Sequence, residues 1–336
     1  MADYKAIKGL KIQTFSGDHP NAASGDIWYN STLGKLRVHK LGAGAWTSAA
    51  NLPTARYIKT SFGTKTAAIY VGGAQPPDST LQNEVLKYNG TAWSEEADFP
   101  ASGTAGVGAG IETAGLVVGW YVGGATGVTS TTTEYDGSSW TAGGSTPNQQ
   151  VDGGSSGTQT ATLYAGGTTG FPTSRTNMSM EYDGSSWTVG NNLTSARISP
   201  LGNSVGTQTA GLFVSGEDPS AVSAKVESYD GTNWTEGPDV NTAKRVGGGN
   251  GTQTAALKYA GFPATNTTES WDGSSWTEVG DLSTPHGYAS GCGYTTGGNT
   301  ASLIAGGTGP AGVDDQVNTV EIWDGAPETT SSWTTS

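Results

Sequence analysis

The chain has 336 residues, of which 53 are glycine, and only 13% of its residues are charged. This composition favours short strands and tight turns over helices. The net charge of −13 at pH 7 disfavours nucleic acid as a partner, because phosphates would be repelled. No apolar stretch approaches the ~20 residues that cross a bilayer, and no signal-peptide core is present. We therefore expect a protein that is made in a cytoplasm and does not insert into membranes.

The first 54 residues predict four short strands, at residues 10–15, 26–29, 35–39 and 45–48. Residues 1–40 carry a formal charge of +3, which leaves −16 for the rest of the chain. A basic segment ahead of an acidic body is typical of a docking arm, although a solvated surface explains the same charges. We interpret residues 1–54 as a divergent repeat unit that also anchors the protein.

Tryptophan recurs along the chain with a period that is constant over its first five members. Trp46, Trp93, Trp140, Trp187 and Trp234 follow one another at intervals of 47 residues, and Trp276 and Trp333 continue the series at intervals of 42 and 57. The phrase YDGSSWT or a close variant surrounds most of them. A period of roughly 40–50 residues with strand-like content indicates the blades of a β-propeller.

Three glycine-containing phrases mark the turns within each unit. Asn-Gly or Asp-Gly precedes the tryptophans from Trp93 onward and supplies the positive φ angles of a tight hairpin. GTKT or GTQT, as at Gly157, is expected to join the first two strands. A glycine pair is expected to close the second strand, where backbones crowd together. These pairs are Gly72-Gly73, Gly123-Gly124, Gly166-Gly167 and Gly306-Gly307.

These units resemble the kelch repeat, which has a double glycine after the second strand, a Tyr in the third and a Trp in the fourth. The resemblance covers residues 55–336 and gives six units, which end at Trp93, Trp140, Trp187, Trp234, Trp276 and Trp333. With residues 1–54 as the seventh unit, it implies an all-β, seven-bladed propeller of four-stranded antiparallel blades. The alternative is six blades with an N-terminal docking arm.

Wording within the repeats also resembles proteins of tailed bacteriophages. GTQTAAL followed by YDGSSWT is similar to repeat proteins of marine tailed phages, and GDIWYNSTLGKLRV resembles an opening found in tail-fibre proteins. The resemblance implies a virion protein of the tail fibre, the tail tip or the capsid exterior, with other virion proteins as partners of the N-terminal region.

One register position is rich in cations. Ten residues after the successive tryptophans stand Arg56, Gly103, Gln150, Arg197, Lys244 and His286. If the blades are equivalent, Arg56, Arg197, Lys244 and His286 approach one mouth of the central channel and form a ring that holds an anionic ligand. The alternative is structural, because arginine at this position commonly bonds to neighbouring backbone in kelch-type blades.

The periodic tryptophans are expected to be buried wedges between blades, because every blade needs the same contact. Trp28 and Trp120 stand out of this register. They are therefore predicted to be exposed contact residues.

We expect no enzyme, no metal and no cofactor. The chain has three histidines and one cysteine, Cys292, and no nucleophile with a base can be assembled. The expected function is to present loops to a glycan or protein on the host surface. Two alternatives remain open: a purely architectural decoration or adaptor protein, and a glycan-active enzyme of unrecognised type.

Overall fold

The computed structural model describes residues 12–16, 27–32, 34–40, 44–57, 60–76, 78–124, 127–170, 174–200, 205–293, 298–312, 314–325 and 329–333. All regular elements within these ranges are β-strands, which confirms the predicted all-β class. The chain forms two compact units. One is Ala45–Asp324, and the other combines Met1–Gly44 with Gly325–Ser336.

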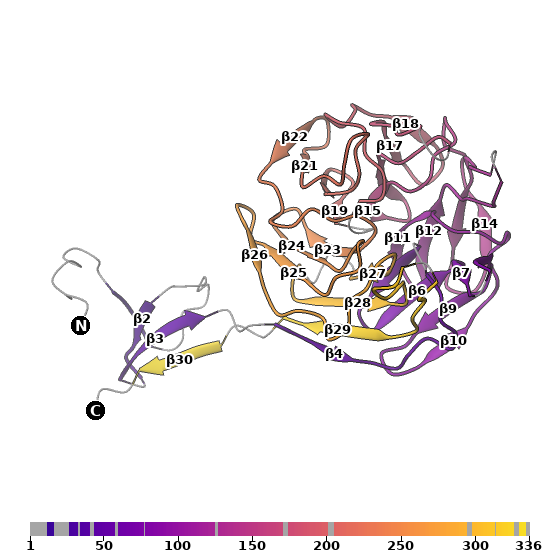
Figure 1. Ribbon diagram of the computed structural model, residues 1–336. Coiled ribbons are helices and arrows are strands. Elements are labelled where there is room, and N and C mark those ends of the chain that lie inside the picture. Colours follow the sequence, from indigo (N-terminus) through magenta and orange to yellow (C-terminus); the bar gives the residue numbers. More distant parts are fainter. Residues whose placement is uncertain are drawn as a thin grey trace. The chain divides into compact units, whose positions relative to one another are not determined.

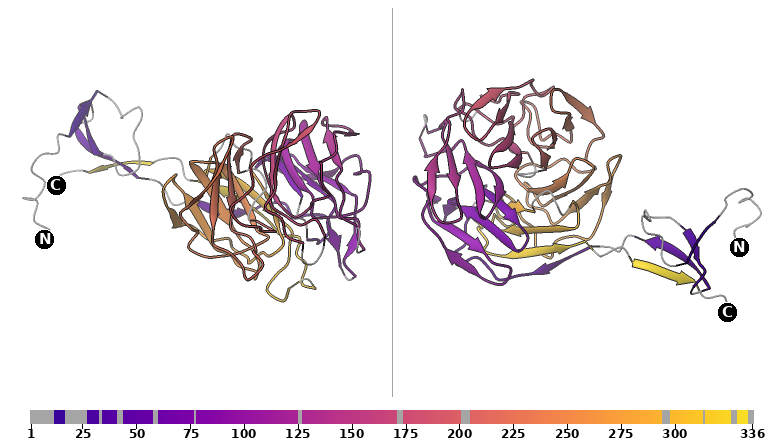
Figure 2. Two further views of the ribbon diagram at one scale, coloured as in Figure 1. Left: turned by 90° about the horizontal axis from the view of Figure 1, so that it is seen from above. Right: turned by 180° about the vertical axis from the view of Figure 1, so that it is seen from behind.

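The larger unit is a ring of six four-stranded antiparallel sheets, seen along its axis in Figure 1 and from behind in Figure 2. Blades 1 to 5 follow one another along the chain. Blade 1 contains β5 (Ser61–Thr64), β6 (Ala67–Val71), β9 (Val85–Tyr88) and β10 (Trp93–Glu95), with a small extra hairpin of β7 (Ala74–Gln75) and β8 (Thr80–Leu81). Blade 2 contains β11 (Val107–Ile111), β12 (Ala114–Val118), β13 (Thr132–Tyr135) and β14 (Trp140–Ala142).

The same order repeats in the next three blades. Blade 3 contains β15 (Gly154–Thr158), β16 (Ala161–Ala165), β17 (Ser179–Tyr182) and β18 (Trp187–Val189). Blade 4 contains β19 (Gly206–Thr207), β20 (Ala210–Val214), β21 (Val226–Tyr229) and β22 (Trp234–Gly237). Blade 5 contains β23 (Gly248–Thr252), β24 (Ala255–Tyr259), β25 (Thr268–Trp271) and β26 (Trp276–Glu278).

Blade 6 closes the ring with strands from both ends of the unit. It contains β27 (Ser290–Cys292), β28 (Ala301–Ala305), β29 (Val320–Asp324) and, as its outer strand, β4 (Ala45–Ser48). Trp46 lies opposite Trp323 in the register in which Trp234 lies opposite Tyr229 in blade 4. The prediction of seven blades is therefore wrong and the six-bladed alternative is confirmed, because the outer strand counted as a seventh blade completes the sixth.

The smaller unit is a separate four-stranded sheet. Its strands are β1 (Gln13–Phe15), β2 (Ile27–Asn30), β3 (Lys35–Lys40) and β30 (Thr329–Trp333), in that order. The predicted strands at 10–15, 26–29 and 35–39 correspond to β1, β2 and β3, although residues 10, 11 and 26 lie outside the described ranges. Trp333 pairs with Leu36 in this sheet. Trp333 therefore does not end a blade. The place in the ring that the sequence analysis assigned to Trp333 is occupied by Trp46.

Hairpin chemistry explains why the outer two strands form where they do. Gly137, Gly184 and Gly273 have φ between 91° and 95°, as the Asp-Gly turns require. The preceding aspartates accept the N–H groups two and three residues ahead: Asp183 Oδ1, for example, lies 2.9 Å from Ser185 N and 2.8 Å from Ser186 N. These carboxylates are thus part of the turns. At the sixth predicted hairpin, after Asp324, the chain leaves the ring instead.

The periodic tryptophans lie between blades, as predicted. The indole N–H of Trp187 in blade 3 donates to Thr132 Oγ1 of blade 2 at 2.8 Å, and that of Trp46 in blade 6 donates to Thr268 Oγ1 of blade 5 at 2.9 Å. The Trp187 ring stacks on Tyr182 with a centroid separation of 4.9 Å. In blades 3 and 6 the tryptophan is therefore buried against the preceding blade.

The GTQT phrase is more than a turn. Gln159 of blade 3 donates from Nε2 to the carbonyls of Gly115 and Tyr135 in blade 2, both at 2.9 Å. Gln208 makes the equivalent bonds from blade 4 to blade 3. The sequence showed the turn, but the contact between blades becomes visible only when the ring is assembled.

The glycine pair after the second strand is correctly predicted in blade 1, where a Cβ on Gly72 would lie 2.7 Å from Gly103 O. In blade 2 the prediction is wrong. Strand β12 ends at Val118, so the equivalent pair is Gly119-Trp120, and Gly123-Gly124 lies further along the loop.

No helix in the described residues is long and apolar enough to cross a membrane.

Candidate functional site: the loop face of the ring

Two kinds of connection gather on one face of the ring. In an antiparallel blade, the loop from the second to the third strand and the linker from the fourth strand to the next blade leave at the same end. We call this end the loop face. Single β-bridges join linker and loop in each blade, as between Tyr57 and Ala74 or between Arg245 and Phe262. The loop face is therefore held by backbone bonds close to the axis.

The predicted cationic register lies in these linkers, and Arg197 shows its role most fully. Its side chain is fully buried. Its guanidinium donates to Ser215 O at 2.9 Å and to Lys225 O at 2.6 Å, and it forms an ion pair with Glu227 at 2.5 Å. Burial lowers the pKa of Arg197, and the Glu227 carboxylate acts in the opposite direction. Arg197 therefore joins linker, loop and third strand inside blade 4.

Two further members of the register are also buried. Arg56 is 1% exposed and forms an ion pair with Glu84. His286 is fully buried, with Nδ1 2.8 Å from Gly306 O and Nε2 3.0 Å from Thr284 Oγ1. These side chains are bonded within their own blades and do not form an open ring around the channel.

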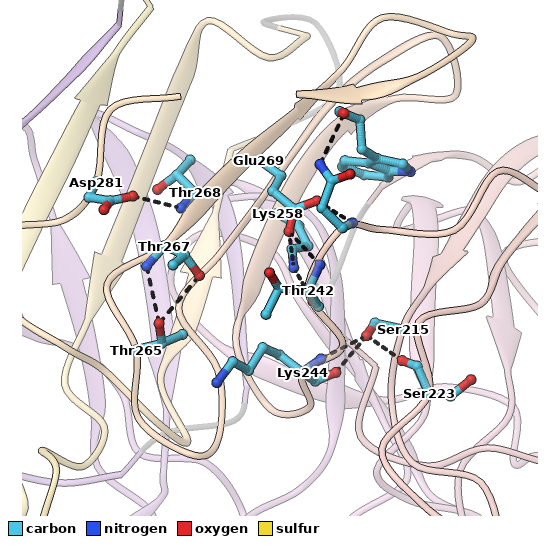
Figure 3. A network of polar contacts seen from close by, with 12 residues as sticks. Ser215, Ser223, Thr242, Lys244, Lys258, Thr265, Thr267, Thr268, Glu269 and Asp281 are labelled. Atoms are coloured by element: carbon cyan, nitrogen blue, oxygen red, sulfur yellow. Dashed lines mark hydrogen bonds and ion pairs between the residues drawn. The ribbon is translucent and has the colours of Figure 1, made fainter. Parts of the chain in front are cut away.

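Lys244 is the exception in the register. Its Nζ lies 3.3 Å from Pro263 O, and Figure 3 shows the ammonium group directed away from Ser215, whose hydroxyl holds the Lys244 backbone. In blade 5 the buried cation is Lys258 of β24, which bonds to Glu269 at 2.7 Å and is 1% exposed. Burial lowers the pKa of Lys258, and Glu269 opposes this shift.

Trp120 fills the gap that Gly103 leaves in the register. A Cβ on Gly103 would lie 2.3 Å from Trp120 Nε1. The Trp120 ring is 1% exposed, packs on Phe99 at 4.6 Å and donates to Ala101 O at 3.0 Å. Trp28 of the terminal sheet is likewise 1% exposed. The predicted exposure of both rings is wrong. For Trp120 the reason is that the indole fills the space beside Gly103.

The axis of the ring is narrow where the inner strands begin. Residues from five blades line the cavity there, among them Asp152, Ser199 and Val246, and its volume is about 20 Å³. That volume holds about one water molecule. Backbone bonds run from blade to blade at this level: Ser199 N donates to Asp152 O at 2.7 Å, and Val246 N to Ser199 O at 3.0 Å. An organic ligand does not fit at this level of the channel among the described residues.

Beside the channel mouth, the loop face carries a cluster of charged and aromatic side chains from five blades. We call it the loop-face patch, and its residues are Tyr57, Arg175, Glu217, Arg245, Phe262 and Tyr288. Arg245 lies over the rings of Phe262 and Tyr288, with 5.2 Å and 5.8 Å to their centroids. The Tyr57 ring lies 6.1 Å from the Tyr288 ring.

One carboxylate group forms ion pairs with both arginines of the patch. Glu217 forms ion pairs with Arg175 and, at 2.9 Å, with Arg245. The side chains of Arg175 and Arg245 are 15% and 24% exposed, and Glu217 bonds to both of them. Two cations against one anion leave the patch positive on a body that is strongly acidic.

The patch was missed at the sequence level because its residues do not share a repeat position. Tyr57 and Arg245 directly follow members of the cationic register, but their equivalents in other blades include Thr104, Val151 and Ile198. Phe262 and Arg175 come from loops of different length. In the sequence these residues can be recognised as departures from the repeat, because the residues that all blades share form the ring itself.

The described residues contain no group of three or more His, Cys, Asp or Glu side chains that could hold a metal ion. Cys292 is buried, and its burial raises the pKa of the thiol to about 12. It is therefore protonated at neutral pH and is no nucleophile.

Comparison with known proteins agrees on the fold. No family model matches the chain, and no curated protein matches it. A solved structure entitled "Structure of YjhT" is similar with a TM-score of 0.67 and 14% sequence identity, over 85% of this chain and 99% of that one. At this identity the similarity supports the β-propeller fold alone.

Proposed function

We propose that the chain is a non-enzymatic virion protein of a tailed bacteriophage, at the tail fibre, the tail tip or the capsid exterior. In this proposal the propeller presents the loop-face patch to the host surface. The repeat's resemblance to kelch-like phage proteins supports the setting. The observation that carries the binding role is the patch itself, with two arginines held by Glu217 beside three aromatic rings.

The patch suits an acidic glycan. A guanidinium binds a carboxylate through two parallel hydrogen bonds, and aromatic rings offer flat apolar surface to the C–H face of a sugar. The acidic body of the protein does not attract an anionic glycan, so the attraction has to come from the local positive charge of the patch. A protein loop with exposed Asp or Glu is the second ligand of the same chemistry.

The ends of the ring support an anchoring role for the terminal unit. Ala45 and Asp324, where the chain enters and leaves the ring, are paired residues of β4 and β29. Paired residues in neighbouring strands lie about 5 Å apart. The chain therefore enters and leaves the ring at neighbouring residues of blade 6.

The binding role is tested with purified protein on an array of acidic bacterial polysaccharides and on host cells. Arg245→Gln should weaken attachment at least about tenfold, as expected for loss of a charged hydrogen bond. Lys65→Gln is the matched control. Lys65 forms an exposed ion pair with Asp324 in a turn of the opposite face, and its loss should leave attachment unchanged.

Mass spectrometry of purified virions tests the setting separately. Detection in virions with no attachment by the wild-type protein would favour an architectural decoration or adaptor. Depolymerisation of an arrayed polysaccharide would favour the enzyme. Equal attachment by wild type and Arg245→Gln would remove the loop-face patch from the proposal.

A further inference from the structure

Blade 5 carries two lysines where one cation is enough to hold its buried carboxylate. In blade 4 the cation of the linker, Arg197, is bonded to Glu227. In blade 5 Lys258 of β24 bonds to Glu269 instead, and the two side chains are 1% and 2% exposed. Lys244 stands in the linker at the position that Arg197 has in blade 4. The buried ion pair of blade 5 therefore does not need Lys244.

The backbone of Lys244 is held in place while its ammonium group is almost unpaired. Lys244 N donates to Ser215 Oγ at 3.1 Å, and Lys244 O accepts from Gly216 N at 3.1 Å. Figure 3 shows the side chain leading away from this backbone contact. Among the described residues, the ammonium group has one hydrogen bond, to Pro263 O at 3.3 Å, and no ion pair. Such a lysine is able to offer its charge to a ligand.

Lys244 stands beside the loop-face patch. It precedes Arg245 in the chain, and both side chains reach the same short segment of the blade 5 loop. Arg245 lies over the Phe262 ring, 5.2 Å from its centroid, and Lys244 Nζ lies next to Pro263 O. The Arg245 guanidinium is paired with Glu217 at 2.9 Å, whereas Lys244 has no such partner in the described part of the chain. Positive charge at this edge of the patch is thus left for a ligand.

We propose that Lys244 binds a second anionic group of the glycan that the loop-face patch holds. This group lies on the same sugar residue as the first acidic group or on the next one. An ammonium group is a compact point charge without the planar fork of a guanidinium, so it pairs with an anionic group of any shape. The inference rests on the proposed function and narrows the ligand to a glycan with more than one negative charge in the stretch that contacts the patch.

The test measures binding of the intact, purified protein to two pairs of hexasaccharides by isothermal titration calorimetry. One pair is unsulfated chondroitin and its form with one sulfate per disaccharide, and the other is heparosan and its O-sulfated form. Within each pair the carboxylates are the same, and sulfate is the second anionic group. The wild-type protein should bind the sulfated member of at least one pair about two- to fivefold more tightly, as expected for one exposed charge pair.

Four variants separate the second charge from the rest of the patch. Lys244→Gln should remove the preference for the sulfated member and leave the affinity for the unsulfated member unchanged. Lys244→Arg retains the charge and should keep the preference. Lys225→Gln is the matched control, since Lys225 precedes β21 at the end of the blade 4 loop and its ammonium group is already paired with Glu236 at 3.0 Å. It should also keep the preference. Arg245→Gln should weaken binding of both members alike.

The inference is overturned if the wild-type protein binds both members of each pair equally, or if Lys244→Gln keeps the preference. A loss of affinity for the unsulfated member in Lys244→Gln would also overturn it, because the lysine would then support the patch as a whole. The proposed function fails separately. If no hexasaccharide binds, or if Arg245→Gln binds like wild type, the loop-face patch is not a site for acidic glycans and the inference fails with it. Failure at Lys244 with weaker binding in Arg245→Gln would leave the proposed function standing.

Discussion

Blades 4 and 5 are neighbours with the same frame and different side-chain contacts. In both, the turn glutamine (Gln208 or Gln253) bonds to two carbonyls of the preceding blade. Blade 4 meets blade 3 through hydrogen bonds donated by Trp234 and Tyr229, whereas in blade 5 the Trp276 N–H has no partner among the described residues and a tryptophan replaces the tyrosine. The blade contacts are thus made of separable parts, and a blade can lose side-chain bonds while the backbone frame holds it in place.

The buried cation also comes from a different position of the repeat in each of these two blades. In blade 4 it is Arg197 of the linker, and in blade 5 it is Lys258 of the second strand. Both bond to the glutamate at the same position of the third strand, Glu227 or Glu269. The buried ion pair is retained although the residue that supplies the cation is not, which frees Lys244 to reach the surface.

The largest effect is expected from removing the tryptophan wedge. Trp234→Ala should lower the free energy of unfolding by about 3–5 kcal/mol, as large-to-small core changes do. Trp276→Ala should cost about 1 kcal/mol less, because no indole hydrogen bond is lost with it. Denaturant unfolding of the two variants measures the difference. Equal losses would show that the missing bond does not weaken the contact between blades 4 and 5.

A second prediction compares the same register position in the two blades. Arg197→Gln should lower the free energy of unfolding by about 3–5 kcal/mol, since it leaves the buried Glu227 without its cation. Lys244→Gln should cost less than about 1 kcal/mol, because its ammonium group has one exposed contact. Thermal unfolding of both variants distinguishes them. A stable Arg197→Gln protein that has lost attachment would return the ligand site to the cationic register.

The smallest effect concerns pH and the hairpin aspartates. Hydrogen bonds from the hydroxyl of Ser274, from the backbone N–H groups of Ser275 and Ser274 and from the hydroxyl of Ser275 lower the pKa of Asp272 to about 2. The pKa of an aspartate in the unfolded chain is about 4. Its stabilising contribution is therefore complete above about pH 4 and is lost as the pH falls toward 2. In blade 4, backbone N–H groups of Asn233 and Thr232 lower the pKa of Asp230.

Asp272→Asn should leave the melting temperature at pH 7 nearly unchanged, because Asn89 makes the same turn in blade 1. It should reduce the fall of the melting temperature between pH 4 and pH 2, since the group no longer binds a proton. Asp230→Asn is the parallel variant in blade 4. An unchanged acid limb in both would show that other carboxylates govern acid unfolding.

The comparison of the two blades also shows how much could be predicted from sequence. Strand positions, hairpin turns and the tryptophan wedges were predictable, because each depends on residues a few positions apart that recur in every unit. Trp120 could not be placed in this way, since its burial depends on the absence of a side chain at Gly103. The loop-face patch was missed for the same reason, as it arises where single blades depart from the repeat.

By itself the sequence determined the repeating blade, because glycine-containing turns, Asp-Gly hairpins and a periodic indole act locally. Only the tertiary structure decided how the ring closes. Trp46 and Trp333 both continue the tryptophan series, and nothing near either residue shows which one completes the last blade. The decision rests on pairing between β4 and β29, whose residues Trp46 and Trp323 are far apart in the chain and meet only when the ring is closed.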